Sequence, residues 1–158
     1  MSIPKSVTKV NKDGVEFVSS VDKVNYYLFE LTRAALRDVG KYVVKKFKTK
    51  YYSIFKRYSG DGGRSTRYKV YSNKDTMYPR VEIGLPHSHK GKTVTGFYAY
   101  FQEFGTSKQK KLGLLLKTVE EDISEIRKIE SQYLSAIEDE EKIKSIIDES
   151  EYEGNADE

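Results

Sequence analysis

The sequence predicts an α+β fold: a long N-terminal helix, an antiparallel sheet of three to four strands, and a long C-terminal helix packed on one face of the sheet. Three observations lead to this prediction. Apolar residues recur at helical spacing from residue 19 and again from residue 112. Between these segments, three stretches have the alternation or the aromatic content of strands. The strands follow one another closely in the sequence, which favours an antiparallel meander.

At 158 residues the chain is long enough for one hydrophobic core, so we expect a single domain over residues 19–140. Residues 1–18 are interpreted as an N-terminal extension, in which the alternation at 15–19 is compatible with one short strand. Residues 141–158 contain seven acidic residues against two lysines, and their apolar residues are sparse. This composition predicts a solvated acidic tail, and we expect both termini to be disordered.

The first helical segment begins at Ser19, where Asp22 resembles the acidic partner of a capping box. It continues to residue 57, before the glycine-rich connector at 59–63. An unbroken helix of this length would measure about 60 Å, more than a small domain covers. We therefore expect a kink near Gly40 or a break near Thr49.

The middle of the chain contains the expected strands, at 67–71, 79–85 and 95–104. The third segment alternates Tyr98 and Tyr100 with Phe97 and Ala99. As a strand, it would turn one of these sets toward the helices and the other toward solvent or a partner. The polar loop at 86–92 precedes it and has turn chemistry.

The helical period returns at Leu112 and continues to Ile137. The first half of this segment contains four acidic residues close together: Glu120, Glu121, Asp122 and Glu125. Acidic residues early in a helix interact favourably with its positive N-terminal end. The segment is predicted to form the second long helix.

Charge is distributed unevenly along the chain. Residues 1–117 contain 24 Lys and Arg against 9 Asp and Glu, a net charge of +15, whereas residues 118–158 contain 4 against 15, a net charge of −11. A basic body favours nucleic acid as a partner. An acidic segment in the same chain can instead pair with the basic face of a neighbouring subunit, so the charge supports polyanion binding and self-assembly equally.

Several classes of function lack their usual residues. The chain has no cysteine, and its only histidines are His87 and His89, for which no third metal ligand stands out. The segment beginning at Gly105 has glycine, threonine, serine and lysine before a helix, but lacks the spacing of a phosphate-binding loop. No apolar stretch approaches the roughly 20 residues that cross a bilayer. We therefore expect no enzymatic activity, no cofactor, no metal and no membrane partner.

One alternative is a domain that binds double-stranded nucleic acid through a basic face. The predicted order helix, strand, strand, strand, helix matches the double-stranded RNA-binding domain, which uses lysines at the start of its last helix. The corresponding lysines here are Lys108, Lys110 and Lys111, and Lys90 and Lys92 of the polar loop would belong to the same basic face.

A more specific likeness involves Tyr98-Ala99 followed by Glu103-Phe104-Gly105-Thr106 and a long helix. This pattern resembles the putative tail-component family of long-tailed bacteriophages. The resemblance implies a structural protein of the virion neck, acting in head completion, tail completion or the joining of the two. It also implies a ring around the DNA channel, with the neighbouring head-connector and tail-tube proteins as partners and contact with DNA as an option.

We expect the interaction residues to lie in the histidine loop, on the tyrosine face and at the corner before the last helix: His87, His89, Lys90, Lys92, Tyr98, Tyr100, Glu103, Phe104, Gly105 and Thr106. Glu103 is expected to accept hydrogen bonds from backbone amides or to pair with a basic residue, and so to hold the corner. Gly105 is expected to adopt a backbone conformation that other residues resist.

Overall fold

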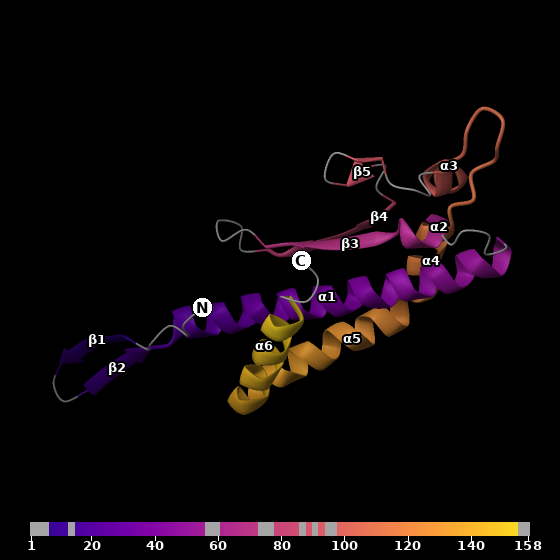
Figure 1. The fold of residues 1–158 in the computed structure, drawn as a ribbon. Helices are drawn as coiled ribbons and strands as arrows, with labels where there is room; N and C mark the ends of the chain where they lie inside the picture. The colour runs from indigo at the N-terminus through magenta and orange to yellow at the C-terminus, as the bar shows by residue number, and fades with distance from the viewer. Residues whose placement is uncertain are drawn as a thin grey trace.

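A computed structural model describes residues 7–12, 15–55, 61–72, 78–85, 88–89, 92–93 and 98–154. One helix, α1 (Val21–Ile54), runs through the middle of the molecule (Figure 1). The hairpin formed by β3 (Arg67–Tyr71) and β4 (Arg80–Gly84) lies along one side of α1, and helices α5 (Ile123–Ser135) and α6 (Glu140–Gly154) lie along the other. The fold is α+β, as expected, with α1 as its central layer.

The first predicted helix is confirmed, but α1 is continuous and has no break at Thr49. Its N-cap residue is Ser20, which makes no side-chain capping hydrogen bond, so the predicted capping box of Ser19 and Asp22 is wrong. At about 1.5 Å per residue its 34 residues extend for roughly 50 Å. Elements along both sides cover this length, which explains why a break is not needed.

Three buried clusters follow one another along α1. Near its start, Tyr27 and Leu31 pack with residues of α6, and near its middle, Val39 and Val43 pack with Ile126 of α5. Toward its end, a third cluster joins α1 to the elements around the Gly105 corner: Phe47, Tyr51, Leu85, Ala99 and Leu114. The apolar face of α1 is therefore the core of the whole fold.

Gly40 serves close packing rather than a kink. A Cβ atom at this position would lie 2.6 Å from Cδ2 and 2.8 Å from Cγ of Tyr68 in β3. These ring atoms are near the root of the side chain, so Tyr68 has little freedom to move away. The absence of a side chain at Gly40 allows the β3–β4 hairpin to approach α1 closely.

Gly40→Ala is expected to lower the free energy of unfolding by about 1–3 kcal/mol, the usual cost of overpacking, although alanine favours the helix by about 1 kcal/mol. Denaturant unfolding measures the change. Thr49→Ala, on an exposed part of the same helix, should alter stability by less than about 0.5 kcal/mol. A stabilised Gly40→Ala protein would show that Tyr68 does not pack against this glycine.

The first two strands of the expected sheet are confirmed. β3 pairs with β4 antiparallel, and the register places Tyr68 opposite Ile83 and Val70 opposite Val81. The third strand, expected at 95–104, is wrong from residue 98, because Tyr98–Phe104 forms helix α3. Described strands form three separate two-stranded sheets, so a sheet of three to four strands is not confirmed.

The helical conformation of α3 has a local and a tertiary cause. Its sequence, YAYFQEF, lacks β-branched residues and contains alanine, glutamine and glutamate, which favour helices. Ala99 is 1% exposed within the cluster around Phe47 and Tyr51, which is possible because its side chain is small.

The second predicted helix is divided. Helix α4 (Leu114–Glu121) is followed by a turn at Asp122 and then by α5, after which a 3-10 helix, η1 (Ala136–Glu138), leads to α6. Residues 140–154 are helical, and Ile143 and Ile147 are buried against Tyr27 and Leu31, so the described part of this segment is not a solvated tail. Helices α5 and α6 pack on α1, across from the hairpin, so the expected packing of the C-terminal helix on the sheet is not confirmed.

The shorter elements complete the described chain. A hairpin of β1 (Val7–Lys12) and β2 (Val15–Ser19) extends beyond the N-terminal end of α1 (Figure 1), and its second strand agrees with the alternation at 15–19. A short helix, α2 (Asp61–Arg64), precedes β3, and β5 (Ser88–His89) pairs with β6 (Lys92–Thr93). Among the helices of the described residues, none has the length and hydrophobicity needed to cross a membrane.

Candidate functional site

Helix α3 has an unusual distribution of side chains. Its buried side consists of Ala99 and Glu103, whereas its exposed side consists of four aromatic residues: Tyr98, Tyr100, Phe101 and Phe104. Each of the four is at least 41% exposed. A surface helix normally turns its large apolar side chains toward the core. The reversed arrangement indicates that these rings are available to a partner.

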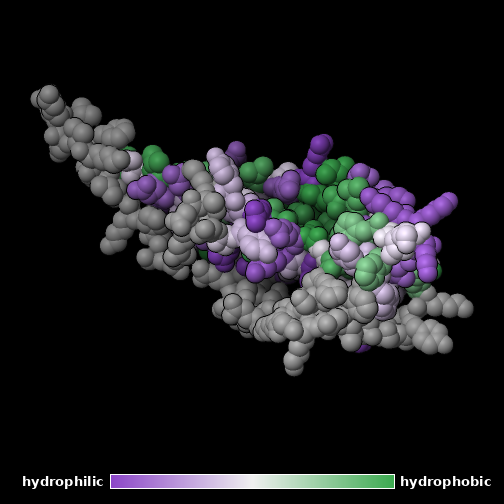
Figure 2. Space-filling model, turned by 90° about the horizontal axis from the view of Figure 1, so that it is seen from above, coloured by the Kyte–Doolittle hydropathy of each residue, from purple (hydrophilic) through white to green (hydrophobic). Residues whose placement is uncertain are grey.

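The aromatic side chains contact one another on this exposed face. The ring centroids of Tyr100 and Phe104 are 4.6 Å apart, and those of Tyr100 and Phe101 are 5.8 Å apart in an edge-to-face arrangement. Mutual contact holds the rings in place without a partner, which lowers the entropy lost on binding. Hydrophobic side chains also gather on the upper face of the molecule in the half where α1 ends (Figure 2).

Glu103 connects α3 to the beginning of α4. Its Oε2 accepts a hydrogen bond of 2.8 Å from the backbone N–H of Leu114, and its Oε1 accepts one of 2.8 Å from that of Leu115. The side chain is only 5% exposed. The first N–H groups of a helix have no partner within the helix, and its N-terminal end attracts negative charge. Glu103 therefore acts as an N-cap supplied from a neighbouring helix.

Backbone hydrogen bonds close the segment between the two helices. The N–H of Leu112 donates to the carbonyl of Gln102 (3.0 Å), and the N–H of Gly113 donates to the carbonyl of Glu103 (3.1 Å). Together with the Glu103 side chain, these bonds pair four successive N–H groups, at residues 112–115, with the end of α3. The corner before α4 is thus a fixed structure. Glu103 holds it by accepting hydrogen bonds from backbone amides, which is one of the two roles that the sequence predicts for this residue.

Gly105 begins this corner with a φ of +80°, in the left-handed region that favours glycine. A Cβ atom at Gly105 would lie 2.8 Å from the backbone N of Lys111 and 3.0 Å from the backbone O of Gln109. The position therefore requires glycine for conformation and for space, which confirms the expectation for Gly105.

The loop from 106 to 111, which we name the corner loop, is exposed along its whole length. Thr106 and Gln109 exchange backbone hydrogen bonds, and Oγ1 of Thr106 accepts from the N–H groups of Lys108 and Gln109. These bonds close the loop on itself. Its three lysines, Lys108, Lys110 and Lys111, are exposed and follow α3 closely in the chain.

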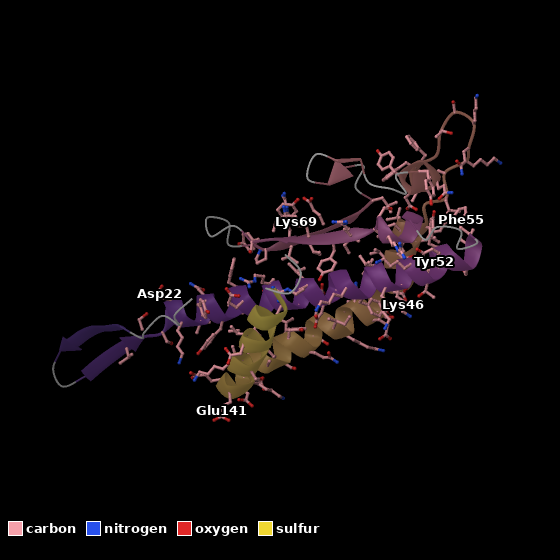
Figure 3. The ribbon with its side chains drawn as sticks, in the orientation of Figure 1. Asp22, Lys46, Tyr52, Phe55, Lys69 and Glu141 are labelled. Atoms are coloured by element: carbon pink, nitrogen blue, oxygen red, sulfur yellow. The ribbon has the colours of Figure 1, made fainter. Side chains whose placement is uncertain are left out.

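Tyr51 attaches α3 to the end of α1. Its hydroxyl donates a 2.7 Å hydrogen bond to Oε1 of Gln102, and its ring packs beside Phe55 and Tyr52, which extend from the end of α1 toward α3 (Figure 3). Burial, with smaller contributions from Tyr98 and Tyr52, raises the pKa of Tyr51 to about 12 from an ordinary value of 10.0.

This shift predicts a loss of stability at alkaline pH. Because the pKa of Tyr51 is higher in the folded chain than in the unfolded chain, its contribution is complete below pH 10 and is lost as the pH rises through about 12. Tyr51→Phe removes this contribution and should flatten the dependence of unfolding on pH over that interval. Unfolding midpoints of both proteins across the interval measure the difference, and identical slopes would contradict it.

Three carboxylates of the C-terminal part, Glu121, Asp122 and Glu140, are paired with α1 in the same chain. Lys50 Nζ lies 2.6 Å from Glu121 Oε2 and 3.4 Å from Asp122 Oδ2, and Lys23 Nζ lies 2.8 Å from Glu140 Oε1. Hydrogen bonds from Lys23 and Lys144 lower the pKa of Glu140 to about 2. Among the described residues, the exposed carboxylates that remain without an ion pair include Glu120, Glu138, Glu141 and Asp148.

The histidine loop is only partly described. His87 and Lys90 lie outside the described residues, while His89 pairs with Lys92 in the short β5–β6 hairpin. The structure therefore brings together only part of the predicted set, in and beside α3: Tyr98, Tyr100, Glu103, Phe104, Gly105 and Thr106. Within the described ranges, no three side chains of His, Asp or Glu gather in a way that could hold a metal ion.

Sequence reasoning missed three residues of this site: Tyr51, Phe101 and Gln102. A strand over 95–104 would place Phe101 on the face opposite Tyr100, but in a helix the positions 100, 101 and 104 lie on one side. A test of the helical period over residues 98–104 would have grouped them. The pairing of Tyr51 with Gln102 depends on tertiary structure and leaves no local signal.

Comparisons of the chain with protein family models, with curated proteins and with solved structures found no match.

Proposed function

We propose that this protein is a non-enzymatic structural component of a long-tailed bacteriophage, a neck or tail-completion protein that works by oligomerising around the DNA channel. The proposal combines the sequence resemblance at 98–106 with the geometry of the same residues. Its other partners would be the neighbouring head-connector and tail-tube proteins. Its location would be the virion, after assembly in the host cytoplasm.

The observation that carries the proposal is the way the motif residues are used. Ala99, Glu103 and Gly105 make contacts within the chain: Ala99 fills the core, Glu103 caps α4, and Gly105 permits the turn. These contacts fix a helix whose outer side is aromatic and a loop whose outer side is basic. The motif therefore builds a rigid surface, which suits assembly with other subunits better than it suits chemistry.

Deleting the gene from the phage or prophage that carries it tests this function. Electron microscopy should then show DNA-filled heads and tails that remain separate, and the wild-type gene supplied in trans should restore joined, infectious particles. A matched pair of alleles uses the same assay: Glu103→Ala, at the capping site, should restore less than Glu120→Ala, at an exposed site on α4. Normal joined particles in the absence of the gene would refute the neck role.

The alternative is binding of double-stranded nucleic acid, which the exposed lysines of the corner loop favour. The element order expected for the double-stranded RNA-binding domain is not found, because α3 replaces the third strand. Binding through phosphates weakens steeply with salt, since each contact releases counterions. Titration with RNA and DNA duplexes at low and at physiological salt distinguishes the neck function from duplex binding. Absence of binding at low salt would exclude this alternative. Tight binding that is retained at physiological salt would favour it.

A further inference from the structure

Two exposed surfaces of the molecule are complementary in charge. The first, which we name the aromatic-basic surface, consists of the exposed rings of α3 and the lysines of the corner loop: Tyr98, Tyr100, Phe101, Phe104, Lys108, Lys110 and Lys111. Among the described residues, none of these lysines has an ion-pair partner. The surface therefore offers a large apolar area beside three positive charges.

The second surface lies where α5 meets α6. Leu134 is 63% exposed and Ile137 is 39% exposed. Ala136, which lies between them in the sequence, is only 2% exposed. Three exposed acidic side chains follow within a few residues: Glu138, Asp139 and Glu141. Glu138 and Glu141 have no ion-pair partner in the described part of the chain. We name the exposed residues of this region the leucine-acidic surface: Leu134, Ile137, Glu138, Asp139 and Glu141.

The two surfaces cannot meet within one molecule. Gln102 of α3 is bonded to Tyr51, near the end of α1, whereas Glu140, beside the second surface, is bonded to Lys23 near the start of α1. Positions 23 and 51 are about 40 Å apart along a helix that rises about 1.5 Å per residue. Figure 3 likewise shows Glu141 and Phe55 toward opposite ends of α1.

We propose that the aromatic-basic surface of one copy docks on the leucine-acidic surface of the next copy, in a head-to-tail contact. Aromatic rings would cover Leu134 and Ile137, and the lysines of the corner loop would pair with Glu138 and Glu141. An apolar centre with a charged rim is the usual composition of a specific interface. This inference rests on the proposed function, because it names the contact by which subunits would assemble.

The geometry of the contact decides what kind of oligomer forms. Two different surfaces at opposite ends of a molecule make a heterologous interface, which continues from copy to copy until a ring closes. A two-fold dimer would instead use the same surface twice. The distinction can be measured, because a heterologous interface is destroyed by altering either surface and is restored by mixing chains altered on different surfaces.

The experiment uses the full chain and two double charge reversals. Lys108→Glu with Lys110→Glu alters the aromatic-basic surface, and Glu138→Lys with Glu141→Lys alters the leucine-acidic surface. Sedimentation over a range of concentrations at low and physiological salt should show self-association of the wild type, weakened by salt. Each reversal should abolish the association. Circular dichroism and melting curves confirm that every variant is folded.

Matched controls carry the same change of charge elsewhere. Lys45→Glu with Lys69→Glu alters exposed positions on α1 and β3, and Glu120→Lys with Asp148→Lys alters exposed positions on α4 and α6. Both control proteins should associate as the wild type does. Loss of association in the controls would attribute the effect to net charge and would overturn the proposed contact.

Mixing the two altered chains gives the decisive result. Each retains one intact surface, and the reversed surfaces of the two chains are opposite in charge to each other, so a mixture should associate through alternating copies of the two chains, while each chain alone stays monomeric. A mixture that remains monomeric, or a wild type that stays monomeric at every concentration, would overturn the inference. Loss of duplex binding in the Lys108/Lys110 variant without a change in its mass would assign the loop to nucleic acid instead and would also overturn it.

The outcomes for the contact and for the function are separable. If the reversals leave association unchanged while deletion of the gene still yields unjoined heads and tails, the neck function stands and this pair of surfaces is wrong. If the mixture associates while deletion of the gene has no effect on particles, the contact stands and the neck function is wrong.

Discussion

Glu103→Ala is expected to lower the free energy of unfolding by about 3 kcal/mol, one of the two largest effects of a single substitution in this protein. The change removes two hydrogen bonds from a carboxylate to the N–H groups of Leu114 and Leu115, in a site that is almost fully buried. Hydrogen bonds to a charged group contribute about 1.5–3 kcal/mol each, and a buried donor left without a partner adds a penalty. Urea unfolding measures the loss.

Two further substitutions test whether the loss of the Glu103 hydrogen bonds causes the destabilisation. Glu103→Gln keeps the shape and one acceptor oxygen but turns an amide N–H₂ toward a backbone donor, so its cost should lie between those of the wild type and Glu103→Ala. Glu120→Ala, at an exposed carboxylate on α4, should change stability by less than about 0.5 kcal/mol. Equal stability of Glu103→Ala and Glu120→Ala would mean that the cap contributes nothing.

Gly105→Ala is the second large effect, with an expected loss of about 3 kcal/mol. The left-handed conformation costs a non-glycine residue about 1–2 kcal/mol. The added methyl group would also press on the backbone at Lys111 and Gln109, and overpacking of this kind costs about 1–3 kcal/mol. Gly105→Val should be worse, because a β-branched residue resists this conformation most strongly.

The other glycines serve as graded controls in the same thermal and denaturant unfolding assays. Gly113 also has a positive φ, +61°, but the nearest atom to an added Cβ is Cε of Lys111 at 3.4 Å, so Gly113→Ala should cost only the conformational part, about 1–2 kcal/mol. Gly84, at the end of β4, has open space around an added Cβ, so Gly84→Ala should be close to neutral. A Gly105→Ala protein as stable as Gly84→Ala would show that the turn is not as described.

Glu103 and Gly105 are expected to act as one unit. Both hold the same corner, so once Glu103 is removed the corner can relax and Gly105→Ala should cost less than it does in the wild type. Neighbouring residues that share a structure typically couple by about 0.5–3 kcal/mol. A double-mutant cycle measures this coupling, and strictly additive losses would mean that the cap and the turn are independent.

Part of the charge that is unevenly distributed along the sequence is paired within the folded chain. The sequence shows a basic part and an acidic part, which suggested pairing between subunits. In the structure, Lys50 and Lys23 of α1 already pair with Glu121, Asp122 and Glu140 of the same chain. The proposed pairing between copies therefore uses charges that have no ion pair among the described residues, and this is why the corner loop and the junction of α5 with α6 carry the proposed contact.

Periodicity alone was sufficient to locate three elements. The apolar repeat located α1, and the alternation at 67–71 and 79–85 located β3 and β4, because a long repeat has only one way to bury its apolar side. The expected kink at Gly40 failed for a specific reason. A glycine within a helix indicates either a bend or a close neighbour, and only the position of Tyr68 distinguishes the two.

The spacing of the isoleucines in α6 is that of an amphipathic helix. Ile143, Ile146 and Ile147 have the spacing of one helical face, yet the many acidic residues around them favoured a solvated tail. Ile143 and Ile147 are buried because α1 is long enough to offer Tyr27 and Leu31 as a site for α6. An amphipathic helix of this kind is stabilised by its packing partner rather than by its own propensity.

The sequence was enough to identify the residues of the Gly105 corner, since a glycine followed by polar residues between two ordered segments predicts a turn, and Glu103 was expected to hold it. The composition of the preceding segment is compatible with a helix, but tertiary structure decided that it is one with its aromatic side outward. A helix of seven residues is too short to be stable by itself, so its local pattern carries little information. The burial of Ala99 beside Phe47 and Tyr51, together with the cap that Glu103 provides for α4, outweighs the preference of the aromatic residues for a strand.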